Sequence, residues 1–144
     1  MAIGIEELKK IFVTRTGILT DVEFEDIEKA ATGANRPLEQ LLMERGFVSQ
    51  RYFLELIGEL YGVPIAELKM GDIDTEALAL IPEHFATTNL VIPFAKSDQV
   101  LKVAMVDPKN EEVIRAMRRV AGCELEIFVS TEHAIKKALI LYHG

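Results

Sequence analysis

The chain has 144 residues, of which 49% are hydrophobic and 27% charged, and its formal net charge is −7. This composition is that of a folded globular protein, and the length suits one compact domain or two small lobes. The acidic balance argues against nucleic-acid binding, the single cysteine excludes an internal disulfide, and no apolar run approaches the roughly 18 residues of a membrane span. We therefore expect a cytoplasmic protein that does not insert into the membrane directly.

The first half of the chain predicts helices. A short opening helix should end near Gly17. Thr20 and Glu23 then have the spacing of a capping box, in which the hydroxyl accepts from the third amide and the carboxylate reaches back. A helix is therefore expected over about 21–31.

Two more helices should follow in this half. Pro37 suits the first turn of one, and Gly46 suits its C-terminal cap. Ser49 should cap a longer helix that ends near Gly62. Its apolar stripe predicts an inward face made of Tyr52, Phe53, Leu56, Ile57 and Leu60.

A weak internal repeat links two of these helix starts. The stretches GILTDVEF at 17–24 and GFVSQRYF at 46–53 both read glycine, two apolar residues, a hydroxyl side chain and, four residues later, phenylalanine. Any pair of helix–turn–helix units has this appearance, so two copies alone carry no functional inference.

The pattern changes around 66–73, where Gly71 and Asp72 mark a hinge. Beyond it Asp74 should cap a helix, and the order helix, strand, strand, helix, strand, helix follows. We predict an α+β fold: an N-terminal helical lobe over 1–70, then a small α/β sandwich over 71–144 with a roughly three-stranded sheet. Outside these elements, the basic run RAMRR at 115–119 is typical of a solvated helix face.

Asp107 follows the most apolar strand and precedes Pro108, which raises the question of catalysis. An Asp at the N-cap with Pro at the first helical position is a common helix start, and we interpret Asp107 in that way. The sequence offers no base, nucleophile or metal ligand at a recognisable spacing, and no phosphate-binding loop. We predict no catalytic residues, no metal site and no cofactor.

Several motifs occur together in an order that resembles a known family. These are LMERGFVSQRYFLELIGELYGVPIAEL, then IDTEALALIPEHFATTNLVIPFAKSDQVLKVAMVDPKN, and a last helix that closes in LYHG. Over about residues 35–144 the chain is similar to the N-terminal domain of type II secretion and type IV pilus assembly ATPases. The resemblance implies a helical lobe followed by an α/β lobe, placed ahead of an ATPase core. The chain is then expected to be part of such an ATPase or a stand-alone adaptor.

Some members of that family bind cyclic di-GMP through the first lobe, and the resemblance implies candidate residues here. The motif reads Arg-Leu-Gly, two apolar residues, Gly, an apolar residue and a closing Gln. This chain has Pro37, Glu39 and Leu60 at the Arg, first Gly and Gln positions, with Arg36 one step away. The candidate ligand- or partner-binding residues are Arg36, Leu38, Leu42, Gly46 and Val48.

Two hypotheses follow from the resemblance. The first is a non-catalytic interaction module that docks to the cytoplasmic domain of an inner-membrane secretion or pilus platform protein, so that the chain is peripheral to that membrane. The alternative is a domain that senses cyclic di-GMP.

Overall fold

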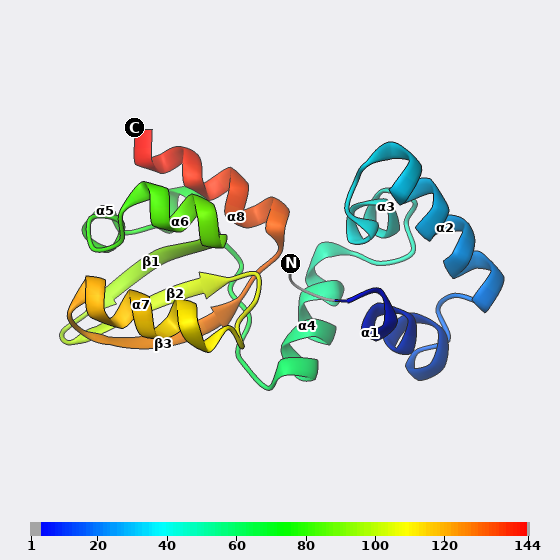
Figure 1. The fold of residues 1–144 in the computed structure, drawn as a ribbon, viewed down its shortest axis with the longest axis horizontal. Coiled ribbons are helices and arrows are strands. Elements are labelled where there is room, and N and C mark those ends of the chain that lie inside the picture. The colour runs from blue at the N-terminus through cyan, green and yellow to red at the C-terminus, as the bar shows by residue number, and fades with distance from the viewer. Residues whose placement is uncertain (1–3, 144) are drawn as a thin grey trace. The chain divides into compact units, whose positions relative to one another are not determined.

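The structure, a computed structural model, describes residues 4–143. Contacts within the chain divide it into two compact units, 1–56 and 57–144, which are called the first and second unit below (Figure 1). The first unit is built from helices and the second contains a three-stranded sheet. The α+β fold predicted from the sequence is confirmed.

The first unit begins with α1 (Ile5–Lys9), which continues as a π-helical turn over Lys10–Arg15. It continues with α2 (Asp21–Ala34), α3 (Leu38–Glu44) and the first part of α4 (Gln50–Tyr61). Its core holds the fully buried side chains of Phe12, Phe24 and Leu42. The rings of Phe12 and Phe53 stack with centroids 6.2 Å apart, which joins the opening helix to α4.

The repeat seen in the sequence has a structural counterpart. Gly17 and Gly46 both have positive φ, +67° and +80°, a backbone region that disfavours any side chain. In each copy the hydroxyl then caps a helix: the Thr20 Oγ1 accepts the Glu23 amide and the Ser49 Oγ accepts the Tyr52 amide, both over 3.1 Å. The equivalent apolar side chains are buried in both copies: Leu19 with Val48, and Phe24 with Phe53.

The second unit carries short helices around its sheet. The helices are α5 (Thr75–Leu78), α6 (Glu83–Asn89), α7 (Glu111–Ala121) and α8 (Glu132–Ala138), with 3-10 turns over Met70–Asp72 and Leu139–His143. The strands are β1 (Val91–Ser97), β2 (Val100–Met105) and β3 (Glu124–Val129). Asp74 caps α5, as expected, through a 2.9 Å hydrogen bond from the Glu76 amide.

The strand order is β1-β2-β3, with β1 antiparallel and β3 parallel to β2. The register of the hairpin shifts between Pro93 and Ala95, because proline has no N–H to give to a ladder. The helix α7 connects the two parallel strands (Figure 1). Its Met117 is fully buried and belongs to the same core cluster as Val103 and Met105. The core of this unit therefore lies between the sheet and its helices.

Residues 57–70, assigned to the helical lobe from the sequence, lie in the second unit. The Val129 amide donates to the Pro64 carbonyl and the Ala66 amide donates to the Val129 carbonyl, both over 2.9 Å. Gly58 leaves no room for a side chain, because a Cβ there would lie 2.7 Å from Cγ2 of Ile65. The segment after α4 is therefore bound to the end of β3.

Some residues differ from their predicted roles. Asn110, not Asp107, is the N-cap of α7: its Oδ1 accepts the Val113 amide over 3.2 Å, while Asp107 accepts the Asn110 amide with its backbone carbonyl. The helix starts later because the Pro108-Lys109 step forms a turn first. Two side chains expected inward, Tyr52 and Leu60, are partly exposed instead.

Candidate functional site

The candidate residues from the sequence lie on α3 and its two ends, but they do not form one exposed surface. Leu38, Leu42 and Val48 are 4%, 0% and 6% exposed, so they belong to the core of the first unit. They hold α3 and the start of α4 in place. A ligand in solvent would meet Arg36 and the backbone at Gly46 instead.

Gly46 ends α3 in a left-handed turn. Its amide donates to the Met43 carbonyl, and the next amide, of Phe47, donates to the Leu42 carbonyl over 3.0 Å. This pair of bonds satisfies carbonyls that the helix end leaves free. Nothing lies within 4 Å of a Cβ built on Gly46, so the backbone here is open to approach.

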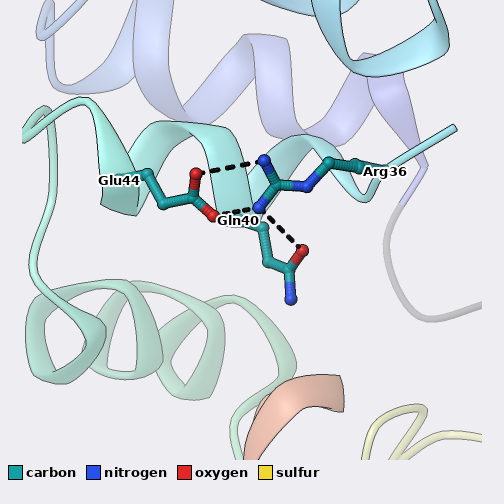
Figure 2. A network of polar contacts seen from close by, with 3 residues as sticks. All are labelled: Arg36, Gln40 and Glu44. Atoms are coloured by element: carbon teal, nitrogen blue, oxygen red, sulfur yellow. Dashed lines mark hydrogen bonds and ion pairs between the residues drawn. The ribbon is translucent and has the colours of Figure 1, made fainter. Parts of the chain in front are cut away.

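Arg36 lies just before α3 and reaches along its exposed side (Figure 2). Its Nη1 donates to Oε1 of Glu44 over 3.1 Å, and its Nη2 donates to Oε1 of Gln40 over 3.3 Å. The same Nη2 also donates to Oε2 of Glu44. The guanidinium of Arg36 thus binds the carboxylate of Glu44, from the other end of α3, in the forked geometry that arginine forms with carboxylates.

The pairing sets the electrostatics of the site. The hydrogen bond to Glu44 raises the pKa of Arg36, and the hydrogen bond from Arg36 lowers the pKa of Glu44. Both side chains are solvent-accessible, 39% for Arg36 and 55% for Glu44. The pair is charged at neutral pH, and an anionic ligand that engages Arg36 has to replace Glu44.

Gln40 and Glu44 were not among the candidates from the sequence. Their signal was the spacing of residues 36, 40 and 44, which places three side chains on one side of a helix. Pro37, between Arg36 and the helix, hid this pattern because it is the non-helical N-cap of α3. Glu39, at the position where the resembling motif has glycine, adds a further negative charge in the first turn of α3.

Residues 4–143 contain no group of three histidine, cysteine, aspartate or glutamate side chains that lie where they can share a metal ion. In the same range, none of the helices combines the length and the apolar character that crossing a bilayer requires.

The family follows from comparison with known proteins. Residues 61–144 match the family model of the MshEN domain, the N-terminal domain of type II secretion and type IV pilus ATPases. This match covers more than half of the chain, and the chain belongs to that family.

Curated relatives place the domain within longer proteins. The chain is 28% identical over 103 residues to the type IV pilus assembly ATPase PilB of Myxococcus xanthus, covering 72% of this chain and 18% of that protein. It is 26% identical over 129 residues to PilB of Thermus thermophilus, covering 88% of this chain and 14% of that protein. The chain therefore spans less than a fifth of the length of these ATPases.

Solved structures share the fold. The structure of MshE with cdg, cyclic di-GMP, has a TM-score of 0.64 at 21% identity and covers 97% of this chain and 99% of that one. The N-terminal domain of XpsE has a TM-score of 0.58 at 22% identity, with 96% of each chain covered. Both units of the chain thus lie within the matched region.

Proposed function

We propose that this chain is a non-catalytic docking and regulatory module of a type II secretion or type IV pilus assembly ATPase. In this role it binds the cytoplasmic domain of an inner-membrane platform protein, from the cytoplasm, and is held at the membrane only through that partner. The module has no cofactor of its own. ATP hydrolysis belongs to the remainder of the ATPase or, for a stand-alone adaptor, to a separate chain.

One observation carries this proposal. The family match is to the MshEN domain, and the matched stretch corresponds to only 14–18% of the pilus ATPases. A small domain of a much larger motor contributes by contacts with other components rather than by the motor's own chemistry.

The experiment is a binding measurement with the purified cytoplasmic domain of an inner-membrane platform protein from the same organism. The chain is immobilised, and binding is followed by biolayer interferometry across a range of partner concentrations. We expect saturable binding in the micromolar range or tighter, as for other transient interfaces. The absence of saturable binding, with both proteins folded by circular dichroism, would contradict the proposal.

A second candidate function is the sensing of cyclic di-GMP. It is supported by the similarity of fold to MshE with cdg and by the exposed guanidinium of Arg36. Arginine binds phosphate in a bidentate manner, and the open backbone at Gly46 lies at the other end of α3. Glu44 opposes this function because it occupies the guanidinium and repels phosphate.

Calorimetric titration with cyclic di-GMP tests this candidate in the parent chain and three variants. If Arg36 binds the phosphate, Glu44→Gln removes the competing charge and should tighten binding about tenfold, as expected for one charge next to a phosphate. Arg36→Ala should abolish it. The matched control is Glu55→Gln, which removes a carboxylate paired with Arg51 on α4 over 2.9 Å and should leave affinity unchanged. No heat from Glu44→Gln at millimolar ligand would exclude the candidate.

A further inference from the structure

The helix α7 carries the most concentrated positive charge of the second unit. Arg115, Arg118 and Arg119 are all exposed. Positions three and four apart share one face of a helix, so the three guanidinium groups lie together. On the opposite face, the fully buried Met117 anchors the helix in the core of the unit. The arginines are therefore presented by an anchored element rather than by a loop.

These arginines form no ion pair with any side chain among residues 4–143. Elsewhere in that range, Arg36 pairs with Glu44 and Arg51 with Glu55. On α7, Glu111 is four residues before Arg115, the spacing at which Lys136 and Glu132 do pair over 3.1 Å on α8, yet the pair is not formed. The charge on this face is not neutralised within the described chain.

The helix dipole accounts for part of the pattern. Basic residues in the last turn of a helix are stabilised by the partial negative charge there, and Arg118 and Arg119 lie in that turn. Arg115 lies a turn earlier, outside that effect. Arginine is enriched at protein interfaces, and these exposed arginines have no partner among the described side chains.

We propose that the α7 face, defined as Arg115, Arg118 and Arg119, docks an acidic segment of a protein partner. The inference rests on the proposed docking function and names the surface that performs it. Carboxylates spaced along a partner helix match arginines three and four apart, since each guanidinium binds a carboxylate through two parallel hydrogen bonds.

A protein partner fits this face better than a polyanion does. The chain carries a net charge of −7, so a nucleic acid would be repelled by the remainder of the surface. The same argument applies to an extended anionic membrane. A partner helix is narrow enough to meet the α7 face alone, with the acidic surroundings left in solvent.

The test compares a charge-removal variant with a matched control. In the first variant Arg115, Arg118 and Arg119 are all replaced by Gln. In the control three other exposed cations, Lys29, Lys69 and Lys137, are replaced by Gln, which changes the net charge equally. The replaced side chains are exposed, so both proteins should fold, as checked by circular dichroism and thermal melting.

Three probes are applied to each protein: the platform protein's cytoplasmic domain, a synthetic helical peptide with glutamates three and four residues apart, and phosphatidylglycerol vesicles. We expect the parent chain to bind the platform domain and the peptide. The arginine variant should lose about tenfold or more in both affinities, and the control should stay within about twofold. Added salt should weaken the parent's binding because the contacts are ionic.

The outcomes separate the two proposals. Equal binding of the platform domain by the parent and the arginine variant would leave the docking function standing and overturn the α7 inference. Arginine-dependent binding of the peptide without binding of the platform domain would support the inference and contradict that docking function. Binding to vesicles alone, arginine-dependent self-association in sedimentation, or binding to none of the probes would each overturn the inference.

Discussion

The two helix starts of the first unit, 17–24 and 46–53, follow one plan and differ in what surrounds it. In both, a glycine of positive φ, a buried apolar side chain, a hydroxyl cap and a buried phenylalanine recur at the same steps. The first copy adds a second hydrogen bond, in which the Thr20 amide donates to Oε1 of Glu23 over 3.0 Å. The second has Tyr52 at the corresponding step and follows α3, with its pair of Arg36 and Glu44.

This difference separates folding from candidate function. Positions that the copies share are buried or conformationally required, so their role is to start a helix and fix it to the core. The exposed charged groups around the two copies differ. Asp21 of the first copy pairs with Lys9 over 3.5 Å, whereas the segment before the second copy holds the pair of Arg36 and Glu44. A ligand in solvent can distinguish the two copies only through these exposed charged groups.

Removal of the shared phenylalanines should have the largest effect. Phe24→Ala and Phe53→Ala each delete a nearly fully buried ring, and we expect losses of about 3–5 kcal/mol in the free energy of unfolding. Phe53→Ala should cost about 1 kcal/mol more, because Phe53 also stacks on Phe12. Urea titration followed by circular dichroism measures both. If Phe24→Ala lost more unfolding free energy than Phe53→Ala, the stacking of Phe53 on Phe12 would not be what distinguishes the two copies.

The glycines come next. Gly17→Ala and Gly46→Ala should each cost about 1–2 kcal/mol, because both hold a left-handed backbone and neither has a neighbour within 4 Å that a methyl group would meet. The two losses should be alike. Gly33→Ala is the control with opposite sign: it lies in α2 with open space around it, and should stabilise by up to about 1 kcal/mol. Unequal losses at the first two would mean that the turns are not equivalent.

The caps should contribute less. Thr20→Ala and Ser49→Ala each delete one hydroxyl that accepts a backbone amide, and we expect about 1 kcal/mol for each. Glu23→Ala should cost a further fraction of that amount, since the first copy has a second bond to lose. Thermal melts of the three variants check this order. A negligible loss for Thr20→Ala beside a full loss for Ser49→Ala would reverse it.

Much of this fold could be predicted from the sequence because its signals are local. The capping box at Thr20 and the cap at Asp74 are both read within a few residues. The position of 57–70 could not be predicted, because it depends on hydrogen bonds between Pro64, Ala66 and Val129, which are distant in the chain. The cap at Asn110 was missed because Asp107-Pro108 offered a competing start of the same kind.

The candidate site was predicted only in part, for a similar reason. Arg36 was found by resemblance to a motif, but its partner Glu44 lies eight residues away across a helix start. The resemblance also selected buried residues such as Leu42, which support the same helix and do not face solvent. Resemblance selects a segment, and only the structure separates its core from its surface.

The smallest expected effect is the pH dependence contributed by the pair on α3. Arg36 lowers the pKa of Glu44 in the folded chain, so the unfolded chain binds more protons in acid. The stabilisation is therefore fully present above the ordinary glutamate pKa of about 4.3 and is lost as the pH falls through the lowered value. Because both groups are exposed, the effect is small. Melting temperatures of the parent and Glu44→Gln should differ at neutral pH and converge near pH 3.

The control for this prediction is the double substitution. In a chain that already carries Arg36→Ala, Glu44→Gln has no guanidinium to release and should leave the melting temperature unchanged at every pH. The coupling between the two substitutions, measured at neutral pH and again in acid, then isolates the pair from other titrating carboxylates. A difference that persists unchanged in acid, or that survives without Arg36, would mean that Glu44 stabilises α3 by other means, such as its helix propensity.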